Sequence, residues 1–157
     1  PTLLATREPV VQSYYNAAIW AQLPNTPTLS ELKQGFKIAF KERSLESPCY
    51  GGVEGISGRD WWRTTVARVL YHAKPNVTYT DEEFDRYFRR VYQHFGSPSG
   101  YMILEDAQYL LTSLTLKDDE ENNLLLGITS NTPTRHMETV LPMLDSLHNH
   151  FSWFTCS

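Results

Sequence analysis

The sequence predicts an α/β protein in which an all-helical module is joined to a partial, doubly wound (Rossmann-like) core. Three observations carry this prediction: helical periodicity through the first hundred residues, a run of breaker residues at 96–100, and a helix–strand–helix–strand pattern after that run. The chain has 157 residues, of which 41% are hydrophobic, so it is large enough to form a packed core.

Four helices are predicted in the first part of the chain, and three of them carry recognisable starting signals. Thr28 with Glu31, and Thr80 with Glu83, have the spacing of capping boxes. A glycine-rich loop at 48–56 separates the second helix from the third. The predicted starts of the four helices are Pro9, Thr28, Ser57 and Thr80.

The second part of the chain has a different pattern. An amphipathic helix is predicted over Leu104–Leu116, and a short buried strand over Leu124–Thr129. A further helix should begin at Pro133 or Thr134 and run to about His148, before a strand over Phe151–Cys156. Strand, helix and strand in this order predict a βαβ unit of a parallel sheet.

Composition and charge exclude several classes of function. The formal net charge of −4 and a pI near 5.7 are unlike the basic surface of a nucleic-acid-binding protein. No run of about 18 apolar residues predicts a membrane span, so no membrane partner is expected. Two widely spaced cysteines, Cys49 and Cys156, without a Cys-x-x-Cys pattern predict a reduced, intracellular location in the cytoplasm.

The sharpest local signal for a site is the turn that follows the strand at 124–129. Ser130, Asn131 and Thr132 would lie at the carboxyl end of that strand, where ligands bind in open α/β sheets. A hydroxyl, free backbone N–H groups and a helix start together favour an anion such as phosphate. The alternative is that these side chains only cap the following helix.

These residues also carry a resemblance. Gly127 to Thr132 resembles the second motif of the haloacid dehalogenase-like hydrolases, a hydrophobic strand ending in Ser followed by Asn. Pro1 to Leu4 resembles the tail of the first motif, and Arg7 to Val10 resembles the lead into a helical cap. The stretch with Tyr50-Gly51 and Trp61-Trp62 is most similar to the haloacid dehalogenase-like hydrolase domain-containing subfamily, fungal members included.

The resemblance implies three segments. Residues 1–7 would be the end of the first core strand, 8–99 a helical cap, and 100–157 part of the α/β core. Thr2 and Leu3 would then be a remnant of the first motif. The residues implied to hold the phosphoryl oxygens are Ser130, Asn131 and Thr132. Those implied to line a substrate pocket in the cap are Tyr50, Trp61 and Trp62, although the helical stripe favours core packing for the two tryptophans.

The function implied is that of a Mg²⁺-dependent phosphatase acting on a small phosphorylated metabolite through a phosphoaspartate. The nucleophilic Asp would fall three positions before Pro1. The Lys or Arg of the third motif and the acids of the fourth would follow Ser157. We therefore expect a chain truncated at both ends, without a catalytic residue or metal ligand of its own and inactive alone. Mg²⁺ would belong to an intact parent, so whether this chain is an enzyme stays open.

Two other classes of function remain. The chain could be a non-catalytic structural or interaction subunit, associated with a protein partner or with the missing remainder of its own chain, because a partial sheet exposes an edge and an apolar face. It could instead be a purely helical binding module, which requires that Leu124–Thr129 is not a strand.

The remaining polar residues are weaker candidates. Arg135 and His136 could neutralise substrate charge, although surface helix residues are the simpler interpretation. His148 and His150 could bind a metal, but no partner cluster accompanies them, and a favourable contact with a helix dipole is simpler for His150. For the acidic run Asp118–Glu121 a solvated loop is favoured over a metal cluster. Neither cysteine has a basic neighbour in the sequence that would make it a nucleophile.

Overall fold

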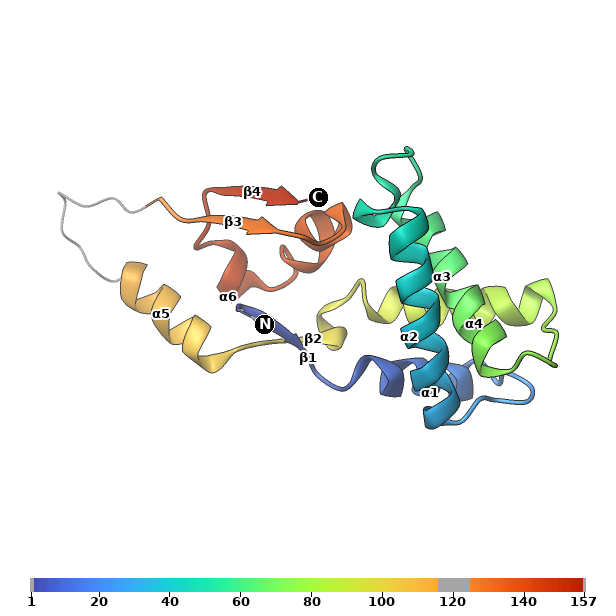
Figure 1. The fold of residues 1–157 in the computed structure, drawn as a ribbon. Helices are drawn as coiled ribbons and strands as arrows, with labels where there is room; N and C mark the ends of the chain where they lie inside the picture. The colour runs from blue at the N-terminus through green and yellow to red at the C-terminus, as the bar shows by residue number, and fades with distance from the viewer. Residues whose placement is uncertain (1, 116–124, 157) are drawn as a thin grey trace. The chain divides into compact units, whose positions relative to one another are not determined.

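The computed structural model describes residues 2–115 and 125–156 of the chain (Figure 1). The chain divides into two compact units. Residues 8–95 form a helical unit, and residues 1–7 together with 96–157 form an α/β unit. The mixed α/β fold class is confirmed. In the described part of the chain, no helix has both the length and the apolar composition that crossing a membrane requires.

The helical unit contains four helices, whose bounds are α1 Val10–Trp20, α2 Leu29–Glu46, α3 Gly58–Ala73 and α4 Asp81–His94. Helix α1 ends at Trp20, and the chain cannot continue it further because Gln22 adopts a φ of 51°. A left-handed residue cannot continue a right-handed helix. The glycine-rich loop contains a short 3₁₀ turn, η1 Cys49–Gly51.

Both predicted capping boxes are confirmed. Thr28 Oγ1 accepts a hydrogen bond from Glu31 N at 3.3 Å, and Glu31 Oε2 accepts one from Thr28 N at 2.7 Å. Thr80 and Glu83 make the same pair of bonds at the start of α4. Such a cap contributes about 1 kcal/mol to helix stability, because it satisfies backbone donors that have no partner within the helix.

Helices α2 and α3 pack closely around a glycine. A Cβ placed on Gly35 would lie 2.5 Å from the Val69 carbonyl oxygen and 3.1 Å from the Ala73 nitrogen. The absence of a side chain at position 35 is therefore what allows the two backbones to approach. The surrounding core is apolar, and its most buried large side chains are Tyr14, Leu32, Val69, Tyr87 and Phe88.

Two short strands begin the α/β unit, of which the first lies within the residues 1–7 that the resemblance implied to end a core strand, and the second was not predicted. β1 Leu4–Thr6 pairs antiparallel with β2 Tyr101–Ile103, in the register Leu4↔Ile103 and Thr6↔Tyr101. A 3₁₀ turn, η2 Pro98–Gly100, precedes β2, and α5 Glu105–Thr115 follows it.

The predicted βαβ unit is confirmed, because β3 Gly127–Ser130 and β4 Trp153–Cys156 pair in parallel (Figure 1). The interpretation as a purely helical module is therefore wrong. The first strand begins later than predicted and is half-buried rather than buried, since Leu125 is 76% exposed and the ladder starts opposite Trp153. Leu124 lies outside the described residues.

The connection between β3 and β4 is not the single helix that periodicity predicted. It contains a π-helical turn, η3 His136–Val140, and a separate short helix, α6 Asp145–His148. Pro142 lies between them and explains the break, because proline has no N–H to donate and its ring clashes with the preceding turn. The apolar side chains of this connection pack with those of all four strands, including Leu4, Ile103, Ile128, Leu141, Leu147 and Phe154.

Candidate phosphate-binding site

Ser130 is the last residue of β3 and pairs with Cys156, the last residue of β4. Both strands run in the same direction, so these two residues mark the carboxyl edge of the parallel pair. Asn131 and Thr132 form the turn that leaves this edge, with Asn131 exposed and Ser130 half-buried. A serine hydroxyl and a polar turn at this edge can donate hydrogen bonds to an anion.

Thr132 brings a further hydroxyl to the same turn. Its Oγ1 is buried and has no hydrogen-bond partner among the residues that the structure describes. Leaving such a group unsatisfied costs about 1–3 kcal/mol. The sequence-predicted residues Ser130, Asn131 and Thr132 therefore lie in one turn, but their side chains differ in how far they reach solvent.

His136 lies at the start of the π-helical turn and is held by a tyrosine from β2. The Tyr101 hydroxyl is 2.7 Å from His136 Nε2, and the two rings meet edge-on at 5.3 Å. His136 Nδ1 is buried and, within the described ranges, makes no hydrogen bond. His136 is thus half-buried and engaged, rather than a plain surface residue of a helix.

Burial sets the charge state of this pair. It raises the pKa of Tyr101 to about 12, although the nearby Arg135 cation opposes the rise. It also lowers the pKa of His136, and Arg135 lowers it further. Both effects favour the uncharged forms, so the pair is a neutral phenol and a neutral imidazole at pH 7.

Arg135 packs against Gly96, the first residue of the α/β unit after the helical unit. A Cβ placed on Gly96 would overlap the Arg135 guanidinium. Arg135 follows Thr132 by three residues in the sequence. Its side chain is half-buried, so its cation is only partly exposed to solvent. The turn after β3 is thus followed by one cation and one neutral imidazole.

Cys156 lies at the same edge of the sheet and is exposed. Its Sγ is 3.7 Å from Thr134 Oγ1, while the neighbouring Thr155 Oγ1 donates to Thr129 Oγ1 at 3.0 Å. These contacts link β4 to β3 and its turn through hydroxyl groups. Nothing in them activates the thiol as a nucleophile.

The residues that resemble the first motif lie immediately before β1. Thr2 is exposed, and Leu3 is half-buried in the same apolar cluster as Ile128 of β3. The Leu3 carbonyl accepts a hydrogen bond from Leu104 N at 3.0 Å. Leu3 therefore contributes to the core of the α/β unit, whereas Thr2 is exposed.

The predicted cap-pocket residues lie together in the helical unit. Trp61 is 1% exposed, and its Nε1 donates to the Ser47 carbonyl at 2.8 Å. The Trp62 ring centre is 5.0 Å from that of Trp61, and the Tyr50 ring centre is 5.3 Å from it. Trp61 is a core residue, as its helical stripe predicted, while Tyr50 and Trp62 are half-buried.

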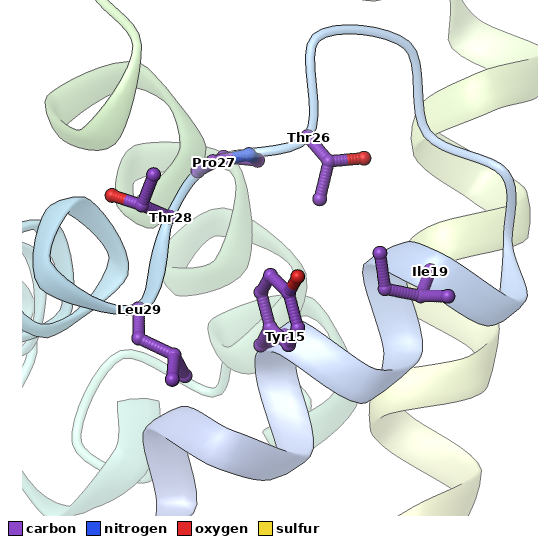
Figure 2. Close-up of a pocket in the computed structure, with 6 residues that line it drawn as sticks. All are labelled: Tyr15, Ile19, Thr26, Pro27, Thr28 and Leu29. Atoms are coloured by element: carbon purple, nitrogen blue, oxygen red, sulfur yellow. The ribbon is translucent and has the colours of Figure 1, made fainter.

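A hollow on the helical unit contains no group suited to catalysis. It is lined by Tyr15 and Ile19 of α1 and by residues 26–29, which lead into α2 (Figure 2). Its polar groups are hydroxyls, and no charged side chain or histidine lines it. The hollow is therefore an apolar surface feature.

The other candidates do not form a site. His148 stacks on Phe154 with ring centres 5.3 Å apart, which gives its ring a packing role. Between residues 2–115 and 125–156, no three histidine, cysteine or acidic side chains gather closely enough to hold a metal ion. The described residues therefore supply no cluster for Mg²⁺, which the resemblance implies only for an intact parent. The acidic run Asp118–Glu121 lies outside the described residues.

Comparison with known proteins supports the resemblance stated above. Haloacid dehalogenase-like hydrolase domain-containing protein 3 of Homo sapiens is 28% identical over 99% of this chain, and that of Bos taurus is 30% identical over the same share. An uncharacterized hydrolase of Schizosaccharomyces pombe is 27% identical over 73% of this chain and 44% of its own length. No protein-family model matches the chain.

A parallel βαβ pair with Ser130 at its carboxyl edge, in a chain that also forms a helical unit, defines a mixed α/β protein of two units. The matches make the relationship specific: the chain is a homologue of the haloacid dehalogenase-like hydrolases, and the resemblance is confirmed. The chain spans 57% of the length of the human and bovine relatives.

Proposed function

We propose that this chain supplies the phosphate-holding part of a haloacid dehalogenase-type phosphatase. The observation that carries the proposal is the position of Ser130, which ends β3 at the carboxyl edge of a parallel pair and is followed by Asn131 and Thr132. In this proposal the Ser130 hydroxyl and the backbone N–H groups of the turn donate to the phosphoryl oxygens.

The charge of the ligand suits the neighbourhood of the turn. A phosphate monoester carries close to two negative charges at pH 7. Arg135 supplies a nearby cation, and the neutral state of His136 and Tyr101 adds no negative charge. The turn after β3 leads into a short, π-helical segment, so we assign the anion affinity to hydroxyl and N–H donors rather than to the dipole of a long helix.

The catalytic part of the proposal is narrower. The sequence contains no Asp-x-Asp-x-Thr-Leu pattern, and the described residues offer no cluster for Mg²⁺. We therefore assign no step of phosphoryl transfer and no metal-dependent step to this chain, and we expect the 157 residues alone to be inactive. A small phosphorylated metabolite, a Mg²⁺ cofactor, a cap formed by residues 8–99 and a cytoplasmic location remain proposals for the whole protein.

The binding proposal can be tested with inorganic phosphate. Titration of the chain, followed through the amide NMR signals of residues 130–132, should give saturable shifts that weaken markedly in Ser130→Ala. Ser113→Ala is a matched control, because Ser113 is a half-buried hydroxyl of α5 that donates to the Leu110 carbonyl at 2.7 Å. Absence of saturable binding in the unaltered chain would overturn the proposal.

A second candidate function is that of an interaction subunit. The α/β unit exposes several large apolar side chains, namely Tyr109 (79%), Leu110 (55%), Leu125 (76%), Met143 (51%) and Trp153 (50%). Exposed apolar surface of this kind favours association with a partner. Light scattering should then show oligomers, or an apolar dye should bind. A monomer that binds no dye contradicts this candidate.

A further inference from the structure

The segment from Gly96 to Tyr101 touches the residues after the candidate phosphate turn at two places. The backbone of Gly96 lies against the Arg135 guanidinium, and the Tyr101 hydroxyl bonds to His136 Nε2 at 2.7 Å. The two partners are consecutive in the sequence, so one short segment holds both side chains that follow the turn. We call residues 96–101 the anchoring segment.

The anchoring segment is itself fixed by backbone hydrogen bonds. Gly100 N donates to the Ser97 carbonyl at 3.2 Å, and the Gly100 carbonyl accepts from Arg7 N at 3.1 Å. Tyr101 is paired with Thr6 in the β1–β2 ladder and is only 7% exposed. A phenol on such a strand has little rotational freedom, so its hydroxyl is a well-placed anchor.

His136 passes this anchoring to the backbone of the turn. The backbone N–H of His136 donates to the Pro133 carbonyl at 2.8 Å. The backbone carbonyl of His136 accepts from Leu141 N at 2.8 Å, and this second bond closes the π-helical turn. The imidazole therefore belongs to a residue whose backbone is bonded on both sides. Fixing His136 therefore also fixes the Pro133 carbonyl, which belongs to the residue directly after Thr132.

We propose that Tyr101 is a positioning residue for the phosphate-binding turn, acting through its hydrogen bond to His136, with Gly96 providing the space in which Arg135 lies. This role rests on the proposed function, because it assigns Tyr101 to the same turn. Tyr101 does not touch the anion in this proposal. It sets the geometry of the donors that do, which reduces the ordering that binding must otherwise complete.

The electrostatic state of the pair is consistent with this role. Burial lowers the pKa of His136, and the Arg135 cation lowers it further, so the imidazole stays neutral at pH 7. The Tyr101 hydroxyl bonds to the His136 ring, and Arg135 is close enough for its charge to lower the pKa of His136. A neutral bond between buried groups does not loosen as salt is added, unlike a surface ion pair.

The test compares Tyr101→Phe, which removes only the hydroxyl, with Tyr109→Phe, which removes the hydroxyl of a tyrosine that is 79% exposed on α5 of the same unit. The probe is inorganic phosphate, and the readouts are its Kd and the nitrogen-15 shifts of the His136 ring. We expect Tyr101→Phe to weaken phosphate binding roughly two- to tenfold, the worth of one hydrogen bond. The His136 ring signals should move in Tyr101→Phe and stay in place in Tyr109→Phe.

Two further variants keep the test independent of one substitution. His136→Phe removes the same bond from the other side, so the double variant with Tyr101→Phe should lose no more affinity than either single variant. Gly96→Ala should displace Arg135 and also weaken binding, while circular dichroism shows whether each variant is folded.

The outcomes separate the two proposals. If the unaltered chain binds phosphate and Ser130→Ala weakens it, but Tyr101→Phe binds as tightly as the unaltered chain, the positioning role is overturned and the proposed function stands. Additive losses in the double variant, or His136 ring signals that do not respond to Tyr101→Phe, also overturn the role. If the unaltered chain binds no phosphate, the proposed function falls and the role falls with it.

Discussion

Gly35 of α2 and Val69 of α3 are in direct backbone contact, and a Cβ on Gly35 would lie 2.5 Å from the Val69 carbonyl oxygen. That oxygen belongs to a helical backbone and cannot rotate away as a side chain would. The two helices can therefore lie this close only because residue 35 carries a hydrogen atom where any other residue has a Cβ.

The first prediction follows from this contact. Gly35→Ala should lower the free energy of unfolding of the helical unit by about 1–3 kcal/mol, because the two helices must separate to admit the methyl group. Urea unfolding followed by tryptophan fluorescence measures the change, since three of the four tryptophans lie in this unit. The exposed neighbour Gln34→Ala should change the same quantity by less than about 0.5 kcal/mol. Equal effects of the two variants would contradict the packing argument.

A second prediction concerns acid stability. The pKa of Glu31 is lowered from 4.5 to about 2, because Lys74 donates to its carboxylate at 2.7 Å and the Thr28 N–H donates as well. A carboxyl with a lower pKa in the folded state stabilises that state above its unfolded pKa. The contribution is therefore present above pH 4.5 and is lost as the pH falls toward 2.

Glu31→Gln should remove this dependence. We expect its urea midpoint to fall less steeply between pH 5 and about pH 2 than that of the unaltered chain. Glu82→Gln is the control, since Glu82 is an exposed acidic residue in the first turn of α4. A pH profile of Glu31→Gln that matches that of the unaltered chain would show that the carboxylate contributes nothing to acid stability.

Trp61 is the subject of a third prediction. Trp61→Phe removes the N–H that bonds the Ser47 carbonyl at 2.8 Å and leaves space in the core, so unfolding free energy should fall by about 1–4 kcal/mol. Trp20→Phe is the matched control, because Trp20 is 58% exposed. Thermal unfolding by circular dichroism compares the two, and a Trp20→Phe loss as large as that of Trp61→Phe would refute the assignment of Trp61 to the core.

The fourth prediction concerns the parallel strands. Trp153 pairs with Gly127, and its indole ring covers the position that a Cβ on Gly127 would occupy. Because Trp153 is 50% exposed, Gly127→Ala should displace the ring into solvent at a cost below about 1 kcal/mol. The indole N–H signal of Trp153 should move in Gly127→Ala and remain in Thr129→Ala. An unmoved signal in Gly127→Ala would exclude the ring position described.

Local hydrogen-bond chemistry explains what the sequence could predict. Thr28 with Glu31, and Thr80 with Glu83, satisfy the backbone donors of their own helices within four residues, so spacing alone identifies both starts. The position of Ser130 at the end of a strand was also predicted locally, because an apolar run followed by a polar turn is a local pattern, while its role at a phosphate stays a prediction. Pro142 is equally local, and attention to it would have predicted the break after η3.

Features that depend on distant partners could not be predicted. β1 and β2 have only three residues each. Leu4 pairs with Ile103 although the entire helical unit lies between them in the sequence. Three residues are too few to reveal a strand period. The bond between Tyr101 and His136 depends on the same long-range pairing. No local sequence pattern could therefore have identified Tyr101 as a partner of His136.

The β1–β2 ladder also bears on how this chain could vary over evolution. The polypeptide leaves the α/β unit after Arg7 and returns at Gly96, and Arg7 N bonds the Gly100 carbonyl at 3.1 Å. The two points at which the chain leaves and re-enters the α/β unit are therefore joined by a backbone hydrogen bond within that unit. We therefore expect insertions, deletions or exchange of sequence between residues 8 and 95 to preserve the β1–β2 register, because the bonds that set this register lie entirely within the α/β unit.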